Sequence, residues 1–300
     1  MAAPTTFDPR HTLLGTGSFQ KGEELEKCLP PGTKLVQGTP WGASAWTATY
    51  KVTAELADGT RAFFFVKTAK NRGAVMMEGE SNSLQSIDRP GTYFLIMDFL
   101  DLEIALPDPT VLGRVVADLH KNSTSPTGKF GFATPTYHGR HIQPNDWDES
   151  WSRYFARLLA IFFEIDVSVN GPWREYEEAF ETLRARVIPR LLGPLQAGGR
   201  ALKPCLVHGD LWEDNTGIAV GTGRPVLYDA SAMYAHNEYE LGMWRRDEIK
   251  IGISHIDAYL QHCPPSEPAH QFDDRNRLYS IKFKLTHSSG WPSLHETRKK

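Results

Sequence analysis

The sequence of 300 residues lacks long hydrophobic runs, paired cysteines and a secretion signal. Its longest apolar runs, such as 62–66 and 158–163, are far shorter than the roughly 20 residues that a membrane-spanning helix needs. Its three cysteines, Cys28, Cys205 and Cys263, lie far apart without CxxC spacing, which argues against a disulfide framework and a zinc site. The first residues also lack the apolar segment of a signal peptide. We therefore expect a cytoplasmic protein with no membrane partner.

An excess of charge of one sign is missing as well. Lysine and arginine number 33 and aspartate and glutamate 36, which gives a net charge of -3. This balance provides no broad cationic surface, so we expect no nucleic-acid partner, and any anionic ligand needs a local site. Hydrophobic residues at 40% and charged residues at 23% are ordinary for a folded globular protein. The length suits one large domain or two packed domains.

Alternation of apolar and polar residues predicts strands in the first third of the chain. Residues 45–54 alternate strictly, as in a half-buried strand. Asp58 and Gly59 then predict a hairpin turn, and 60–68 the returning strand. A further strand is expected at 92–100. These patterns predict a small antiparallel sheet.

After residue 100 the pattern becomes helical. Asp108 followed by Pro109 is typical of a helix start. The spacing of apolar residues predicts further helices at 151–164, 173–187, 240–259 and 273–285, with short strands at 205–207, 217–220 and 225–229. We therefore predict an α+β fold with two domains, a strand-rich unit over 1–100 and a larger helical unit over 101–300.

One motif carries the chemistry. Residues 207–215 read VHGDLWEDN, so that Asp210 precedes Asn215 by five residues, and Asp229 follows later at the end of a predicted hairpin. This spacing matches the catalytic loop and metal aspartate of protein-kinase-like phosphotransferases. Phosphoryl transfer needs a proton acceptor, for which Asp210 is the candidate, and oxygen ligands for Mg²⁺, for which Asn215 and Asp229 are the candidates. Taken singly, Asp210 could be a turn residue and Asn215 a cap.

A lysine and a glutamate in the first unit form the second half of this pattern. Lys67 lies near the end of a predicted strand, and Glu80 falls on the apolar stripe of a helix predicted at 75–87. A buried carboxylate needs a compensating cation, so the two are expected to pair and to orient Lys67 toward nucleotide phosphates. Glu78 is the competing carboxylate, and a purely structural ion pair is the alternative reading.

Two weaker signals complete the expected nucleotide site. The loop at 38–44 precedes the first strand and could cover phosphates through Gly42 and Ser44, although it does not match G-x-G-x-x-G. The segment 97–100 would be a hinge whose Asp98 and Leu100 backbone groups contact the adenine edge. An ordinary buried strand end is the alternative for this segment.

Taken together, these motifs resemble the fructosamine-kinase, or ketosamine-3-kinase, family, a relative of the aminoglycoside and choline kinases. Trp212 in HGDLWEDN is the most specific match, and FFFVK at 63–67 and HNEYEL at 236–241 also fit. The segment 229–231 departs from the family, with Asp-Ala-Ser in place of the usual Asp-Pro-Ala. The resemblance implies a bilobal protein-kinase-like fold, with a small antiparallel-sheet lobe for the nucleotide and a larger helical lobe for catalysis.

The resemblance also implies the reaction. A member of this family uses ATP and Mg²⁺ to phosphorylate the 3-hydroxyl of a ketosamine, either a small molecule or a glycated protein, and the phosphate then leaves and regenerates the amine. The substrate amine is cationic, so the acidic residues Glu213 and Glu238 are candidates for binding it, with solvated surface charges as the alternative. Trp212 could stack on the sugar or could simply pack the loop.

Two other functions compete with this interpretation. The first is a small-molecule kinase of the same fold that acts on an aminoglycoside, choline or another amino alcohol. The second is a kinase-like binding module without catalytic activity, which would have lost its metal ligands. The presence of Lys67, Glu80, Asp210, Asn215 and Asp229 in one chain argues against the second.

Overall fold

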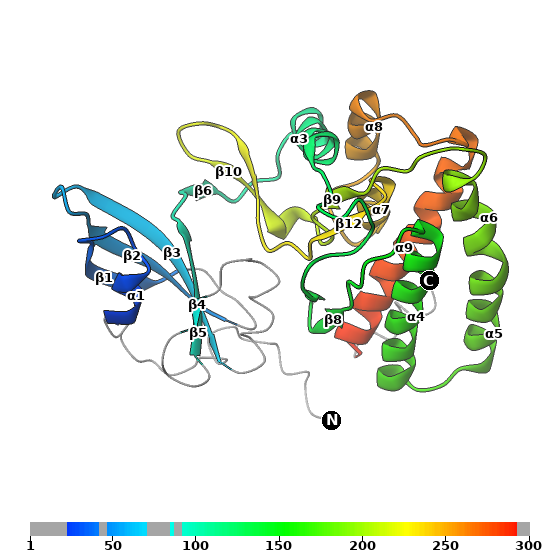
Figure 1. The fold of residues 1–300 in the computed structure, drawn as a ribbon, viewed down its shortest axis with the longest axis horizontal. Coiled ribbons are helices and arrows are strands. Elements are labelled where there is room, and N and C mark those ends of the chain that lie inside the picture. The colour runs from blue at the N-terminus through cyan, green and yellow to red at the C-terminus, as the bar shows by residue number, and fades with distance from the viewer. Residues whose placement is uncertain (1–22, 42–46, 71–84, 87–91, 293–300) are drawn as a thin grey trace. The chain divides into compact units, whose positions relative to one another are not determined.

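The computed structural model describes residues 23–41, 47–70, 85–86 and 92–292. The chain divides into two compact units, Met1–Asp101 and Leu102–Lys300 (Figure 1). No helix in the described part of the chain is long and apolar enough to cross a membrane.

The first unit is built on one antiparallel sheet whose strands follow the order β1-β2-β3-β5-β4. The strands are β1 (Lys34–Pro40), β2 (Ala48–Glu55), β3 (Arg61–Lys70), β4 (Gln85–Ser86) and β5 (Thr92–Asp98). The short helix α1 (Glu23–Lys27) contributes to a small core in which Leu25 packs with Val52 and Val66. The sheet is confirmed where the alternation predicts it.

The β2–β3 turn forms as the sequence indicates. The Asp58 carboxylate accepts hydrogen bonds from the backbone N–H and the hydroxyl of Thr60, and Gly59 adopts a positive φ of 79°. Most of the helix expected at 75–87 lies outside the described residues, but its last part is wrong. Gln85 and Ser86 form β4 and pair with β5, where a helix end was expected.

The second unit is mainly helical. Its helices are α3 (Pro109–Asn122), α4 (Trp151–Asn170), α5 (Arg174–Thr182), α6 (Ile188–Leu192), α7 (Glu238–Met243), α8 (Ile253–His262) and α9 (Phe272–Gly290). Short strand pairs join them, namely β7 (Thr136–His138) with β8 (His141–Gln143), and β9 (Cys205–Val207) with β12 (Met233–Ala235). A three-stranded sheet contains β6 (Leu102–Glu103), β10 (Thr216–Ala219) and β11 (Pro225–Leu227).

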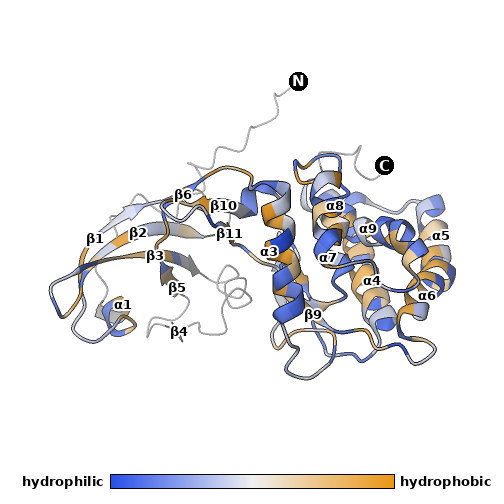
Figure 2. Cartoon of the chain, turned by 90° about the horizontal axis from the view of Figure 1, so that it is seen from above, coloured by the Kyte–Doolittle hydropathy of each residue, from blue (hydrophilic) through white to orange (hydrophobic). Residues whose placement is uncertain are grey.

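The helix predicted to start at Asp108 and Pro109 is confirmed. The Asp108 carboxylate accepts from the N–H of Thr110 at 2.8 Å and caps α3. Figure 2 shows hydrophobic and hydrophilic residues on different faces of α3, and its buried residues Leu112 and Val116 lie one turn apart. This helix packs against α8.

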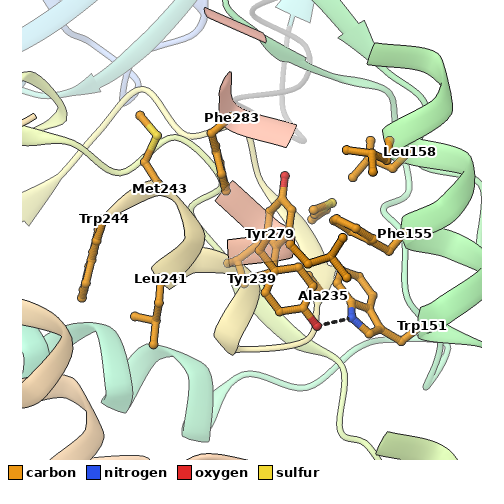
Figure 3. Close-up of a cluster of buried hydrophobic side chains, with 14 of the residues drawn as sticks. Trp151, Phe155, Leu158, Ala235, Tyr239, Leu241, Met243, Trp244, Tyr279 and Phe283 are labelled. Carbon is orange, nitrogen blue, oxygen red and sulfur yellow. Dashed lines mark hydrogen bonds between the residues drawn. The ribbon is translucent and has the colours of Figure 1, made fainter. Parts of the chain in front are cut away.

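An aromatic core fills the space between α4, α7 and α9 (Figure 3). Trp151 at the start of α4 is fully buried, and its indole N–H donates to the Tyr279 hydroxyl of α9 at 2.8 Å. Tyr239 of α7 lies 5.9 Å from each of these two rings. This core packs α4 and α7 against α9.

Two helix predictions need correction. The expected helix at 240–259 is in fact α7 and α8, because the charged stretch between them has no apolar stripe and Gly252 is extended at the start of α8. The expected helix at 173–187 is α5 followed by a π-helical turn, Leu183–Val187. The remaining helices are confirmed, and α4 extends beyond its predicted end to Asn170, after which Gly171 adopts a φ of 84°.

Candidate active site

The VHGDLWEDN motif forms a tight loop between β9 and β10. Gly209 has a φ of 78°, and a Cβ added to it would lie 2.3 Å from the carbonyl oxygen of Ser231. Only glycine fits such a position without moving the backbone. The bend of the loop therefore depends on the close approach of the Gly209 backbone to the Ser231 carbonyl. Asp210 is the next residue after this bend.

Asp210 and Asn215 meet within this loop. The Asn215 side-chain nitrogen donates to the Asp210 carbonyl at 2.7 Å and lies 3.5 Å from Oδ2 of the Asp210 carboxylate. The amide is oriented by this bond, so its oxygen Oδ1 is the atom left to bind a cation. The Asp210 side chain is 22% exposed and can reach a ligand.

The predicted hairpin is confirmed and carries Asp229 back toward Asn215. Thr216 pairs with Leu227, and the N–H of Tyr228 donates to the Asn215 carbonyl at 3.1 Å. Asp229 is exposed and has a φ of 58°, the one positive φ among the described non-glycine residues. Such a conformation is strained and is concentrated at functional sites. A carboxylate and an amide oxygen are the hard donors that Mg²⁺ prefers, so this pair of residues fits that ion.

A histidine and a lysine that the sequence analysis missed lie behind Asp210. His138, at the end of β7, places Nε2 3.1 Å from Oδ1 of Asp210. Lys282 of α9 places Nζ 2.6 Å from Nδ1 of the same ring. Burial raises the pKa of Asp210, but the opposing interactions, chiefly with His138, outweigh it and hold the pKa below its usual 3.8. Asp210 is therefore ionised at neutral pH.

The signal for Lys282 was present in the sequence. Leu278, Lys282 and Leu285 are spaced four and three residues apart, so the lysine occupies the buried stripe of α9 and is fully buried. A buried lysine needs a partner, and this reasoning could have singled it out.

Glu240 is a third residue that the sequence analysis missed, and it supports the loop through hydrogen bonds. Glu240 of α7 is fully buried, and its carboxylate accepts from the backbone N–H groups of His208 and Gly209 at 2.5 and 2.9 Å. Burial raises the pKa of Glu240, but these hydrogen bonds and the His120 ring, 3.7 Å away, lower it overall. The carboxylate thus satisfies two buried donors of the VHGDLWEDN loop.

The predicted substrate residues have different surroundings. Trp212 is half-buried and packs against the core of the second unit, while the Glu213 carboxylate accepts from the N–H of Lys250 at 2.9 Å. Glu238 does not lie at the rim of the loop as predicted. It is fully buried and forms a two-bond ion pair with Arg275 at 2.7 and 2.8 Å, because α7 turns this side chain toward α9.

In the first unit, Lys67 lies on the central strand β3, opposite Thr49 of β2 and Leu95 of β5. It is 7% exposed and faces away from Val66 and the small core, since neighbouring strand residues alternate. Asp98 ends β5 and is exposed, as is Leu100. Glu80, its competitor Glu78, Gly42 and Ser44 lie outside the described residues.

Comparison with protein families now identifies the chain. A family model described as fructosamine kinase matches residues 44–295. The chain belongs to the fructosamine kinase family. The VHGDLWEDN loop, the β10–β11 hairpin and helices α7 and α9 all lie within the matched region.

Individual relatives agree with this family. The chain is 32% identical over 243 residues to the protein-ribulosamine 3-kinase, chloroplastic, of Oryza sativa subsp. indica. This match covers 75% of the chain and 66% of the rice protein, so the chain spans about two thirds of that relative's length.

Solved structures show the same fold. A putative fructosamine-3-kinase from Haemophilus somnus 129PT superposes with a TM-score of 0.65 at 16% identity, covering 89% of this chain and 90% of that one. A thermostable mutant of aminoglycoside phosphotransferase APH(4)-Ia, in a ternary complex with AMP-PNP and hygromycin B, superposes with a TM-score of 0.54 at 14% identity. It covers 92% of this chain and 95% of that chain. The α+β, protein-kinase-like fold is therefore confirmed.

Proposed function

We propose that this fructosamine kinase family member transfers the γ-phosphate of ATP to the 3-hydroxyl of a ketosamine, such as a ribulosamine or fructosamine adduct. The observation that carries the proposal is the Asp210 loop, in which an ionised carboxylate lies beside Asn215 and the hairpin returns Asp229 to it. The name of the rice relative, a ribulosamine 3-kinase, supports the choice of acceptor.

Asp210 is the proposed general base. Its carboxylate takes the proton of the acceptor hydroxyl while that oxygen forms a bond to the γ-phosphorus. The bond between the γ-phosphorus and the bridging oxygen breaks at the same time, and ADP leaves with the electron pair. The 22% exposure of the side chain allows the hydroxyl to reach it.

Asn215 and Asp229 are the proposed Mg²⁺ ligands, through Oδ1 of the amide and the carboxylate. When bound, the ion would neutralise charge on the phosphate oxygens. The backbone at Asp229 supports this role, because the hairpin holds an exposed carboxylate in a positive-φ conformation of the kind that is concentrated at functional sites.

The nucleotide is proposed to bind through the first unit. Lys67, paired with Glu80, would contact the phosphates, Gly42 and Ser44 would cover them, and the backbone of Asp98 and Leu100 would contact the adenine. A double-mutant cycle on Lys67→Ala and Glu80→Ala checks the pair. Coupled residues give a double mutant little worse than Lys67→Ala alone, whereas additive losses of activity contradict the pairing.

Among the substrate candidates, Glu213 and Trp212 stay as proposals because they flank the base on the loop. Glu238 is withdrawn, since its charge is already neutralised by Arg275. Both small ketosamines and glycated proteins are proposed acceptors. We also propose a cytoplasmic location from the separated cysteines, which subcellular fractionation tests.

The proposed function is tested with ATP, Mg²⁺ and a panel of ribulosamines, fructosamines, choline and aminoglycosides. We expect ADP release only with ketosamines, and ³¹P NMR of the product should show the phosphate on O3. Preferential turnover of choline or an aminoglycoside would contradict the acceptor while retaining the kinase. Absence of Mg-ATP binding by calorimetry would instead indicate a binding module.

A further inference from the structure

A chain of three charged or polar side chains runs inward from the proposed base. Asp210 Oδ1 lies 3.1 Å from Nε2 of His138, and Nδ1 of that ring lies 2.6 Å from Nζ of Lys282. His138 is 5% exposed and Lys282 is fully buried. The three residues come from the catalytic loop, from β7 and from α9, and all belong to the second unit.

Aromatic rings enclose the inner end of this chain. The Lys282 ammonium lies 4.3 Å from the centre of the Phe162 ring of α4 and 5.3 Å from that of Phe283. Such contacts stabilise a cation but accept no directional hydrogen bond as strong as that to a nitrogen lone pair. The imidazole Nδ1 is therefore the strongest acceptor for Lys282 in the contacts found within the described residues.

When Lys282 carries its charge, the donors and acceptors of this chain allow one arrangement of protons. A lysine ammonium has only donors, so Nδ1 of His138 must accept from it. Burial and then the Lys282 charge lower the pKa of His138 below its usual 6.5, so the ring is neutral at pH 7 and carries one proton. That proton lies on Nε2 and is donated to Asp210. With the other tautomer, a lone pair would face the carboxylate oxygen.

We propose that His138 and Lys282 are positioning residues for Asp210, with Lys282 setting the tautomer of His138 and His138 holding Oδ1 so that Oδ2 receives the acceptor's proton. The proposal rests on the proposed function for the role of Asp210 as base. A base oriented through a second side chain, itself fixed by a third, is a recurrent way to hold a reactive group in productive geometry.

The first test reads the tautomer directly in the full chain without substrate. ¹⁵N NMR of the histidine rings, with His138 assigned by its loss in His138→Gln, should show a proton on Nε2 at pH 6.5. Lys282→Met should convert a large part of the ring to the other tautomer, whereas Lys284→Met, the same change elsewhere on α9, should not. A proton on Nδ1 in the wild type, or no change in Lys282→Met, would overturn the proposal.

The second test measures turnover. We expect Lys282→Met and His138→Phe to lower kcat by about 10- to 100-fold, the usual cost of a misplaced catalytic group, with the KM for ATP within about twofold. His138→Gln should retain more activity than His138→Phe, because its amide can donate to Asp210 and accept from Lys282. Wild-type kcat in Lys282→Met, or equal losses in the two His138 variants, would contradict the positioning role.

A merely structural role predicts a different outcome. If Lys282 were merely structural, Lys282→Met would have a lower thermal midpoint as well as a lower kcat. If Lys282 is a positioning residue, the thermal midpoint of this variant is unchanged or raised. The pH profile of kcat should also change shape in Lys282→Met, because this variant loses Lys282 while the other titratable and charged groups that face His138 and Asp210, namely His208 and Arg246, remain.

Failure of the proposed function can be distinguished from failure of the positioning role. Wild-type turnover in Asp210→Asn would remove Asp210 as base and this proposal with it, even if the tautomer is as expected. Loss of turnover in Asp210→Asn together with normal turnover in Lys282→Met would leave the kinase function standing and reject only the positioning role.

Discussion

The two sides of Asp210 are built from different parts of the chain. The outer side, with Asn215 and Asp229, comes from one hairpin that follows the base directly. The inner side joins His138 and Lys282, which are 144 residues apart in the sequence. Local hydrogen bonds shape the outer side, and the packing of α9 against the rest of the second unit shapes the inner side. A change on one side should therefore affect a different property from a change on the other.

The environments of the two sides differ accordingly. Asp229 is exposed, while Lys282 is fully buried among aromatic rings. Glu240 links the inner region to the loop by binding two of its backbone N–H groups. Substitutions on the outer side should change metal dependence without unfolding the protein, and those on the inner side should change the orientation of the base.

The largest expected effect on kcat is at Asp210, the residue that both sides share. Asp210→Asn removes the proton acceptor but keeps the shape of the side chain, so kcat should fall by about 10²- to 10⁴-fold. ATP affinity, measured by calorimetry, should stay nearly unchanged because the base acts on the acceptor. A loss of ATP affinity as large as the loss of rate would contradict the role of base.

The next effect isolates the outer side. Asn215→Ala and Asp229→Ala should raise the Mg²⁺ concentration needed for half-maximal activity by at least roughly tenfold, because each removes an oxygen ligand of a hard cation. Asp214→Asn, which neutralises an exposed carboxylate on the same loop, is the matched control and should leave the Mg²⁺ requirement unchanged. Equal Mg²⁺ titrations for all three variants would reject the metal assignment.

A glycine substitution tests the bend between the two sides. Gly223→Ala places a side chain at a φ of 66° with nothing within 4 Å, so it should lower the free energy of unfolding by about 1–2 kcal/mol. Gly209→Ala adds a clash with the Ser231 carbonyl and should cost about 1–3 kcal/mol more, together with most of the activity. Urea unfolding of both variants gives the comparison. Similar losses in the two would mean that the close approach at Gly209 is unimportant.

The sequence predicted the outer side better than the inner side for a physical reason. The hairpin at Asp229 and the helix start at Asp108 depend on a few neighbouring residues, and both form as predicted. The contact between His138 and Lys282 depends on how distant elements pack, which no local pattern encodes. Glu238 shows the same limit, because its acidic side chain gave no sign that Arg275 would neutralise it in the interior.

The last prediction concerns the stability cost of the inner side. Burial lowers the pKa of Lys282 from 10.5 to about 7, although the Asp210 carboxylate opposes the shift. The unfolded chain therefore binds a proton at this lysine more tightly than the folded chain does. This difference destabilises the wild type fully below pH 7 and fades as the pH rises toward the unfolded pKa near 10.5.

Lys282→Met removes that cost while keeping the length of the side chain. Its thermal midpoint should exceed that of the wild type most at pH 6, and the gain should shrink steadily between pH 7 and pH 10. Lys284→Met, on a partly buried position of the same helix, is the control and should show no such trend. A midpoint gain that grows with pH, or a loss at pH 6, would mean that the Lys282 charge stabilises the fold. Lys282 would then stabilise the packing of α9, and it would not be a residue that orients the base at a cost in stability.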